Sequence, residues 1–461
     1  MINKYFRLVA LVSAITMIGS IFVGCGKRAE PATTTTDTAK TEMKPAKLTW
    51  WTYSRHDMDY IKPLVDQFVK DNKYGITIDY IVQSENFRQS LDLAFQSNQA
   101  PDLFTGQDNA KYYVDKGQVE PLDKYLTTEF KARYGNNLYS EGDNGVNDII
   151  YSLPNAGITY RLVYNNDLFK KADISQPPKS ISEMVEAAKK ITAVGKADKA
   201  YGFAMNLKNT QTAIERSSNV IGMRSGFKMY DYKTGKFDFK QYKPILEAFK
   251  QIAADGSMFP GYESLDIDPL RDQFSQGKIG MYLSGSWEPA VYTTQFPTTI
   301  DWKAAPVPSI DGTVKGATFI SGLKWMYMSS KTENKDQVWE VFKAFNNDKV
   351  QVGYTEGGYG NSVVPSVVKV AKAPSVKGMD FFMLSKEDAK WPTHPPERTL
   401  TIEGKPFNDI FAMVIMGKAD FDKEVEGLNQ KYNAALDAAI KAGKEKDWKI
   451  TDFDPKSLLG K

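Results

Sequence analysis

The sequence predicts an α/β fold that contains a parallel sheet and extends over two domains. Residues 48–53 and 76–82 are rich in β-branched and aromatic side chains, which are typical of strands. Between them, apolar residues from 61 to 68 recur at helical spacing, and a third short strand follows at 101–104. Strands that alternate with helices form parallel sheets. The chain has 461 residues, more than one compact domain usually holds, so we expect two domains.

Three polar loops follow these three predicted strands, at residues 53–57, 83–85 and 106–109. The carboxyl ends of parallel strands meet at one edge of the sheet, where α/β proteins bind their ligands. We therefore expect the three loops to contribute side chains to a binding site.

The stretch 274–290 joins a helix end, a buried strand and an exposed aromatic ring. Gly277 can take the left-handed conformation that closes a helix, and residues 278–283 have the length and apolar content of a buried strand. A small-residue turn then presents Trp287 and Glu288. An indole face fits the C–H face of a sugar ring, and a carboxylate fits its hydroxyls. Packing of Trp287 in the core is the alternative, and the residues alone leave both open.

The composition argues against several classes of function. The formal charge is only +3 at pH 7, which gives no electrostatic reason to bind nucleic acid. The chain has one cysteine, Cys25, and two histidines, so an internal disulfide, a zinc site and Cys–His catalysis are not expected. We therefore expect no metal and no cofactor. Aromatic residues make up 12% of the chain, which suits stacking on a ligand, although most of these rings must form the core.

The N-terminus has the pattern of an export signal at residues 1–24. Two cations precede an apolar segment that is short for a membrane-spanning helix. Residues 22–25, Phe-Val-Gly-Cys, resemble the bacterial lipoprotein signal, although that motif usually has an aliphatic residue where Phe stands here. We expect cleavage before Cys25, its lipidation, and a flexible tether at 25–46 that holds the body at the extracellular face of the cell membrane. An uncleaved anchor helix is the alternative.

Two further patterns carry less weight. The glycine-rich segment 353–360 lacks the Gly-Lys-Ser/Thr ending of a phosphate loop, and we expect it to be a ligand-facing loop that includes Tyr359. A carboxylate pair such as Glu85 with Asp108 would suit glycoside hydrolysis. With 56 acidic residues in the chain such pairs arise by chance, so a solvated surface is the expected role.

Several motifs occur in an order that resembles a known family. In sequence they are Leu-Thr-Trp-Trp-Thr at 48–52, Pro-Asp-Leu-Phe at 101–104, Val-Glu-Pro-Leu-Asp-Lys-Tyr-Leu at 119–126, Leu-Val-Tyr-Asn-Asn-Asp-Leu-Phe-Lys-Lys-Ala at 162–172, Phe-Ser-Gln-Gly-Lys-Ile-Gly-Met-Tyr-Leu-Ser-Gly-Ser-Trp at 274–287 and Ala-Pro-Val-Pro-Ser at 305–309. From residue 48 to about 442 the chain resembles the extracellular solute-binding lipoproteins of ABC sugar importers. That family includes the maltose-binding proteins.

The resemblance implies a two-lobe fold of the type II periplasmic-binding-protein class, with a ligand cleft between the lobes. Three crossing strands would join the lobes near residues 157–160, 318–322 and 365–372. The first lobe would comprise residues 47–157 with 323–370, and the second residues 158–322 with 371–461.

The resemblance also implies binding residues. The stacking aromatic position of the maltose-binding pattern matches Trp287, the acidic position after Pro-Asp-x-x matches Asp108, and the first-strand turn matches residues 53–55. The maltose-binding pattern has an Asp-Lys pair where this chain has Ser54-Arg55. It also has a Glu near the first crossing strand, where this chain has Ile-Thr-Tyr. With neighbouring polar and glycine-rich segments included, the expected binding residues are Tyr53, Ser54, Arg55, Glu85, Asp108, Tyr160, Asn206, Trp287, Glu288, Tyr359 and Arg398.

The implied function is capture of a saccharide by hinge closure and its delivery to the transmembrane subunits of an ABC permease. The protein would act as a monomer and would not be an enzyme. A secreted glycosidase, and a receptor of the same fold for a peptide, polyamine or oxyanion, are alternatives; a glycosidase needs two carboxylates about 5 to 10 Å apart. Arg55, Arg161 and Arg398 leave an acidic sugar open.

Overall fold

The computed structural model describes residues 43–83, 86–318, 321–323, 325–393, 395 and 400–460. The chain from Met43 onward forms one compact unit. The predicted signal peptide, Cys25, Glu85 and Arg398 lie outside the described residues. Within the described part, no helix is long and apolar enough to cross a membrane.

The first sheet contains the parallel strands that the sequence predicts. Strand β1 (Ala46–Thr52) lies at its centre and pairs in parallel with β2 (Ile76–Val82) and β3 (Leu103–Gly106). Strand β14 (Trp325–Met328) runs antiparallel to β3, so the order is β14-β3-β1-β2. Helix α1 (Met58–Asp71) packs against β2. We call the part of the molecule built on this sheet the first lobe.

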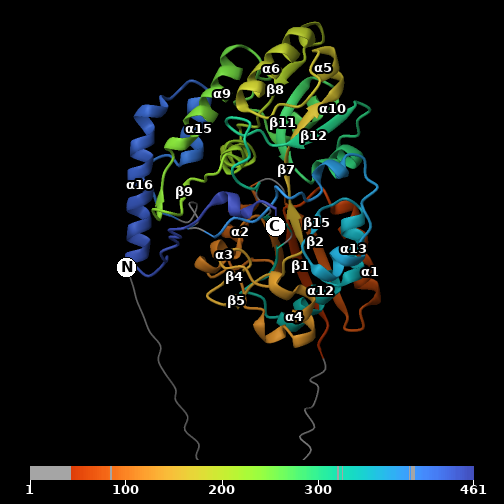
Figure 1. Cartoon of the computed structure of the whole chain (residues 1–461). Coiled ribbons are helices and arrows are strands. Elements are labelled where there is room, and N and C mark those ends of the chain that lie inside the picture. The colour runs from red at the N-terminus through yellow and green to blue at the C-terminus, as the bar shows by residue number, and fades with distance from the viewer. Residues whose placement is uncertain are drawn as a thin grey trace, which may run out of the picture. The chain divides into compact units, whose positions relative to one another are not determined.

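The second sheet has the order β12-β7-β11-β8. Strand β11 (Ile279–Gly285) is buried at every residue, and it pairs in parallel with β8 (Tyr201–Phe203) and antiparallel with β7 (Tyr160–Asn165). Strand β12 (Trp302–Pro306) lies on the other side of β7. Helix α10 (Ile267–Ser275) ends before Gly277, whose φ of +77° confirms the predicted left-handed turn. We call the part built on this sheet the second lobe. In Figure 1, β1 and β2 lie in the lower half of the drawing and β11 and β12 in the upper half.

Helix α6 (Ile181–Gly195) packs closely against the second sheet through a glycine. A Cβ atom at Gly202 of β8 would lie 2.1 Å from the carbonyl oxygen of Ala188 in this helix. Any other residue would therefore push the helix off the sheet. The helix begins after Ser180, whose hydroxyl accepts a hydrogen bond from the Glu183 backbone N–H.

A small third sheet links the two larger ones in sequence. Its order is β13-β6-β15, where β6 is Ala156–Ile158, β13 is Ser321–Leu323 and β15 is Asn361–Ser362. Strands β6 and β13 lie close to the crossing strands predicted at 157–160 and 318–322. The prediction of a third crossing strand at 365–372 was wrong, because residues 365–370 form helix α14 (Pro365–Val370). Proline suits the first turn of a helix, and here it outweighs the strand preference of the valines that follow.

The predicted glycine-rich loop at 353–360 is also corrected. Residues up to Glu356 belong to helix α13 (Asp348–Glu356), so Gly353 lies inside a helix, and only the last four residues form a turn. A Cβ atom at Gly353 would lie 2.4 Å from the Tyr60 hydroxyl oxygen. This glycine therefore allows a side chain to approach the helix closely.

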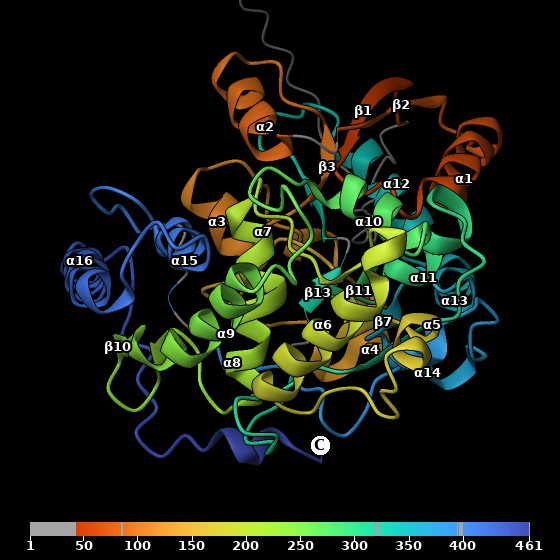
Figure 2. The same ribbon diagram turned by 90° about the horizontal axis from the view of Figure 1, so that it is seen from above.

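The C-terminal helices complete the core of the second lobe. Helices α15 (Phe407–Ile415) and α16 (Phe421–Lys441) add Phe411 and Tyr432 to an aromatic cluster with Phe239. Figure 2 shows both helices on the side of α9 (Lys243–Ala254). The remaining elements are α2 (Phe87–Gln96), α3 (Ala110–Asp115), η1 (Asp123–Tyr125), α4 (Thr128–Tyr134), η2 (Gly135–Asn137), β4 (Gly145–Val146), β5 (Ile149–Ile150), α5 (Asn166–Lys171), η3 (Lys196–Asp198), α7 (Thr210–Ile214), η4 (Glu215–Asn219), α8 (Val220–Arg224), β9 (Tyr230–Asp231), β10 (Lys236–Phe237), η5 (Lys240–Tyr242), α11 (Glu288–Ala290), η6 (Val291–Gln295), α12 (Lys335–Phe345), η7 (Met379–Phe382) and η8 (Pro455–Leu458).

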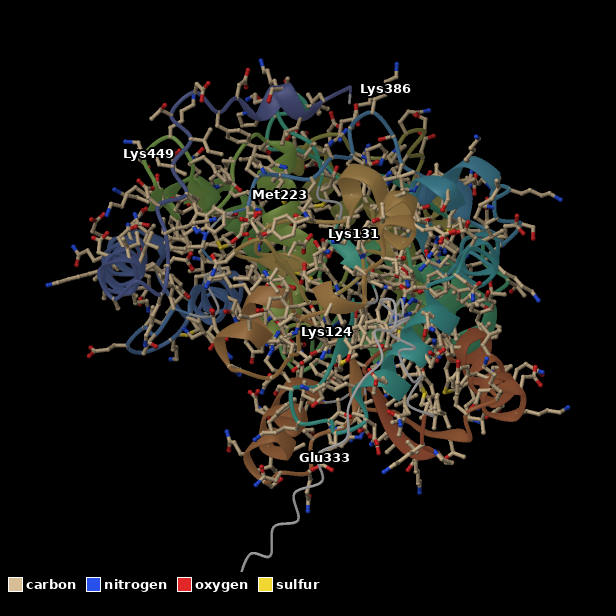
Figure 3. The ribbon with its side chains drawn as sticks, turned by 90° about the horizontal axis from the view of Figure 1, so that it is seen from below. Lys124, Lys131, Met223, Glu333, Lys386 and Lys449 are labelled. Carbon is tan, nitrogen blue, oxygen red and sulfur yellow. The ribbon has the colours of Figure 1, made fainter. Side chains whose placement is uncertain are left out.

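The surface carries the charge that the composition predicts. Lys124, Lys131, Lys386 and Lys449 are exposed, and Figure 3 shows Lys386 and Lys449 near the outline of the body. Met223 lies in the apolar core and is 3% exposed.

One buried ion pair ties the segment after η7 to the second sheet. Arg161 of β7 donates from Nη1 and Nη2 to the two carboxylate oxygens of Asp388, at 2.9 and 2.7 Å. It also donates to the backbone oxygens of Phe381 and Met383. Both charged side chains are at most 6% exposed. A buried guanidinium needs these acceptors because desolvation of an unpaired charge is costly.

We expect Asp388→Asn to destabilise the protein by about 3–5 kcal/mol, because it leaves the Arg161 charge buried without its counterion. Chemical denaturation at pH 7 measures the change. The control is Lys62→Ala, which breaks an exposed pair with Asp66 on α1 and should leave the denaturation midpoint unchanged. Equal midpoints for the wild type and Asp388→Asn would contradict the structural role of this pair.

Candidate functional site

Trp287 follows the last strand residue of β11 and packs toward both lobes. Its ring lies so close to Gly285 that a Cβ atom there would be 2.5 Å from the ring carbons. The ring also meets the Tyr160 ring edge-on, with 5.9 Å between centroids. Although it belongs to a second-lobe segment, Trp287 contacts the apolar cluster of the first lobe. It is only partly buried, which leaves part of the indole accessible.

Glu288 holds the Trp287 ring from inside the lobe. Its carboxylate is 0% exposed, and Oε1 accepts hydrogen bonds from the Trp287 indole N–H at 2.8 Å and from the Ser284 hydroxyl at 2.6 Å. Arg271 of α10 binds both carboxylate oxygens. We predicted from the sequence that Glu288 contacts the ligand. In this structure its carboxylate faces inward, so ligand contact would require displacement of these partners.

Burial and charge act in opposite directions on Glu288. Burial alone would raise the pKa of its carboxyl, but the charge and hydrogen bonds of Arg271, together with the Ser284 hydroxyl, hold the pKa below its ordinary value of 4.5. Burial likewise acts to lower the pKa of Arg271, and the Glu288 charge reverses that effect, so the pKa of Arg271 is raised. Both groups are therefore charged at neutral pH.

Arg216 lies over the Trp287 ring. Its Cζ atom is 5.0 Å from the ring centroid, which is cation–π geometry. It belongs to η4, a single π-helical turn between α7 and α8. Burial lowers the pKa of Arg216, and the positive charge of Arg271 lowers it further. The same guanidinium interacts electrostatically with Tyr53 of the first lobe and with Tyr160.

The loop after β1 supplies the first-lobe side of the site. Tyr53 is partly buried and packs on Phe87, with ring centroids 6.0 Å apart. Burial and the nearby charge of Asp57 raise the pKa of the Tyr53 phenol to about 12, so this hydroxyl stays protonated and can donate. Ser54 is 2% exposed, and Arg55 is exposed. The structure thus brings Tyr53 within electrostatic range of Arg216, which lies over Trp287, while the Arg55 side chain is exposed.

Asp108 follows β3, as the parallel-sheet argument predicts, but its carboxylate is engaged within the protein. Arg88 of α2 donates to both of its oxygens, at 2.8 and 2.5 Å. The Tyr113 hydroxyl accepts from the Asp108 backbone N–H and fixes the loop. Asp108 is 4% exposed, so its predicted contact with a ligand hydroxyl stays a prediction.

Two hydrogen bonds connect the lobes beside this site. Arg55 Nη1 donates to Asp268 Oδ2 of α10 at 2.8 Å, and Arg88 Nη1 donates to Gln211 Oε1 of α7 at 2.9 Å. The Arg55–Asp268 pair is about one third to one half exposed on each side, so water weakens it. Both contacts join the predicted binding edge of the first lobe to helices of the second.

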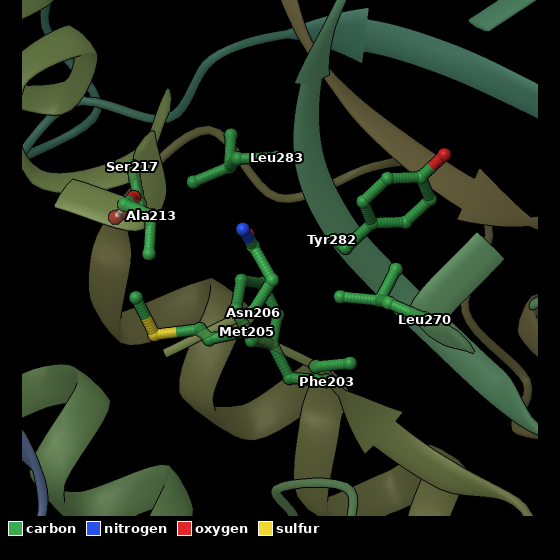
Figure 4. A pocket seen from close by; sticks show the side chains of 9 residues that line it. Phe203, Met205, Asn206, Ala213, Ser217, Leu270, Tyr282 and Leu283 are labelled. Carbon is green, nitrogen blue, oxygen red and sulfur yellow. Dashed lines mark hydrogen bonds between the residues drawn. The ribbon is translucent and has the colours of Figure 1, made fainter. Parts of the chain in front are cut away.

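The other three predicted residues that the structure describes each lie in a different environment. Asn206 lines a small cavity inside the second lobe with Phe203, Ser217 and Tyr282 (Figure 4). Its Nδ2 donates to Thr212 Oγ1. Tyr359 stacks on Tyr60, with centroids 5.2 Å apart, in the first lobe. Tyr160 is at the site itself, against Trp287. Their contact with a ligand stays a prediction, as does that of Glu85 and Arg398 outside the described residues.

Sequence reasoning missed the arginines that organise the site. Arg88, Arg216 and Arg271 contact or face Asp108, Trp287 and Glu288, respectively. Arg271 lies on α10, the helix before β11. A basic residue on that helix, close in sequence to the carboxylate beside Trp287, is the signal that could have indicated it. A π-helical turn has no sequence signature that we could apply to Arg216.

The profile of a family described as bacterial extracellular solute-binding protein matches residues 54–352. This chain belongs to that family. The match includes residues 54–57 of the first-lobe loop, strands β2, β3 and β14 of the first sheet, the whole second sheet and Trp287. Family members are solute-binding proteins, and their extracellular description fits the export signal predicted from the sequence.

This chain is similar to several named proteins and solved structures. A binding protein of Brucella abortus is 27% identical over 299 residues, covering 63% of this chain and 69% of that one. The sn-glycerol-3-phosphate-binding periplasmic protein UgpB of Brucella melitensis is 25% identical over 433 residues, covering 85% and 94%. Among solved structures, an ABC transporter solute-binding protein from Thermotoga lettingae bound with α-D-tagatose superposes with a TM-score of 0.69. It is 20% identical and covers 84% of this chain and 99% of that one. This likeness confirms the predicted two-lobe α/β fold.

We expect Glu288→Gln to destabilise this solute-binding protein by about 3–5 kcal/mol at pH 7, because the Arg271 charge then stays buried without its counterion. The folded-state pKa of Glu288 is lowered, so the ion pair contributes fully above pH 4.5 and its contribution is lost as the pH falls through the folded-state pKa. Urea denaturation at pH 7 and at about pH 3.5 should therefore show a smaller difference between variant and wild type at the lower pH. A difference that grows on acidification would contradict this account.

Proposed function

We propose that this protein is the receptor of an ABC importer and that it binds a saccharide between its lobes. The observation that carries the proposal is the Trp287 ring, which is partly exposed, held in place by Glu288 and next to first-lobe side chains. A rigid aromatic face matches the C–H face of a pyranose or furanose ring. The tagatose-bound structural neighbour supports a sugar as the ligand class.

Binding by lobe closure fits the distribution of the site residues. Tyr53 and Arg55 come from the first lobe, and Trp287 and Arg216 come from the second. A ligand that contacts both sets stabilises the arrangement in which the lobes meet. We propose that the lobes comprise residues 47–157 with 323–370, and residues 158–322 with 371–461. The two large sheets and their separate apolar clusters support this division.

Delivery would require the closed receptor to contact the transmembrane subunits of a permease. We propose that the mature chain begins at lipidated Cys25 and that the predicted tether, up to the compact body that begins at Met43, holds the monomer at the extracellular face of the cell membrane. The N-terminal sequence pattern supports this. Replacement of Cys25 by serine should move the protein from the membrane fraction to the soluble fraction, and an unchanged distribution would contradict the anchor.

The ligand class can be tested with a thermal-shift screen of neutral mono- and oligosaccharides, polyols and peptides. A ligand that binds only the folded state raises the melting temperature. Raised melting temperatures with saccharides, and none with peptides, would support the proposal. A secreted glycosidase is distinguished by prolonged incubation with the binding sugar and chromatography, because a receptor returns the sugar intact.

We expect Trp287→Ala to weaken saccharide binding about 30- to 150-fold. A sugar ring that removes roughly 100 Å² of apolar surface from water at Trp287 gains about 2.5 kcal/mol. Isothermal titration calorimetry on the folded variant measures the loss. Trp287→Phe keeps an aromatic face and should retain most of the affinity, while unchanged affinity in Trp287→Ala would remove this ring from the binding site.

A further inference from the structure

Arg216 is a partly buried cation, and one nitrogen of its guanidinium is buried without a hydrogen-bond partner among the described residues. Its Nη1 atom is inaccessible to solvent and has no hydrogen-bond partner among them. Arginine carries five donors and stays charged in proteins, so a buried N–H without an acceptor is costly. Such a group in a native structure calls for an explanation, and one explanation is a ligand.

Two carboxylates predicted for the site, Glu288 and Asp108, are each bound by another arginine. The Glu288 charge acts on Arg216, but the Glu288 carboxylate is already bound by Arg271, Ser284 and the Trp287 indole. Asp108, on the first-lobe side, is bound at both oxygens by Arg88. Each of these carboxylates thus has its own arginine, and Arg216 is a further positive charge beside Trp287.

The surroundings fix the guanidinium where a ligand would lie. It rests over the Trp287 ring, and its charge acts on the hydroxyl-bearing rings of Tyr53 and Tyr160, one from each side of the site. The π-helical turn η4 that carries it is a rare conformation that is frequent at functional sites. In the same turn, Ser218 Oγ and Asn219 Oδ1 are buried without a partner among the described residues.

We propose that Arg216 binds an anionic group, a carboxylate or a phosphate, on the hydroxylated ligand of this site. The proposal rests on the function proposed above, since it assumes that the ligand stacks on Trp287. A guanidinium can donate two parallel hydrogen bonds to either group, and these are among the strongest that proteins make. The aromatic rings would bind the sugar skeleton, and Arg216 would select for its charge.

The test compares matched ligands by isothermal titration calorimetry at pH 7 and low ionic strength. The pairs are galactose with galacturonate and glucose with glucose 6-phosphate, and glycerol 3-phosphate serves as a small phosphate ligand. We expect the wild type to bind an anionic member at least tenfold more tightly than its neutral partner. Preference for galacturonate identifies a carboxylate as the group, and preference for a phosphate ester identifies a phosphate.

Variants of Arg216 assign that preference to its side chain. Arg216→Gln should lower affinity for the anionic ligand about 10- to 150-fold and for the neutral partner less than threefold. Arg216→Lys keeps the charge without the fork and should retain part of the preference. It also serves if Arg216→Gln proves unstable in thermal unfolding. Arg224→Gln is the control, because it removes an arginine that pairs with Glu387 elsewhere in the lobe.

Each outcome bears on one of the two proposals. Equal or tighter binding of neutral sugars by the wild type, or an anion preference that survives in Arg216→Gln, overturns the role of Arg216 and leaves the saccharide receptor standing. Loss of the same preference in Arg224→Gln also overturns it, because the effect would then be one of net charge. Absence of binding by any sugar or polyol, neutral or anionic, overturns the proposed function and this inference with it.

Discussion

The buried carboxylate of Glu288 is the group on which the rest of the candidate site depends. Taking a charge out of water is costly, and Arg271 compensates by binding both oxygens while Ser284 donates a third contact. Glu288 Oε1 also accepts a hydrogen bond from the Trp287 indole N–H, which fixes the ring. Because α10 and β11 supply the members of this network, the ring is oriented by two regular elements of the lobe core. A side chain so held loses little conformational entropy when a ligand stacks on it.

The two lobes contribute different chemistry to the same region. The first lobe offers loops at the carboxyl ends of parallel strands, where Tyr53 and Asp108 lie. The second lobe offers the end of β11 and the turn η4, with Trp287 and Arg216. Contacts such as Arg55–Asp268 join the lobes through partly exposed charges, which are weak in water. Weak direct contacts suit a receptor, since the ligand then supplies much of the free energy that favours closure.

The sequence predicted those parts of the structure that depend on local pattern. The alternation around β1 to β3, the buried strand β11 and the turn at Gly277 follow from side-chain type and spacing, and the structure confirms them. The third crossing strand at 365–372 was carried over from the family resemblance, and it was wrong because Pro365 begins a helix there. The arginines of the site were missed for a different reason. Arg88 meets Asp108 20 positions away, and Arg216 meets Trp287 across 71, so only the fold brings them together.

The electrostatics of the site favour binding of a polar, anion-bearing solute over glycoside hydrolysis and over binding of a polyamine. A retaining or inverting glycosidase needs a general acid whose pKa is raised so that it is protonated near neutral pH. Glu288, the carboxylate beside the stacking ring, has a lowered pKa and lies inward, so it is unsuited to that role. A polyamine needs unpaired carboxylates, whereas Glu288 and Asp108 are each bound by an arginine. Arg216 would then repel the cation, and a hydroxylated ligand with negative charge meets the opposite condition.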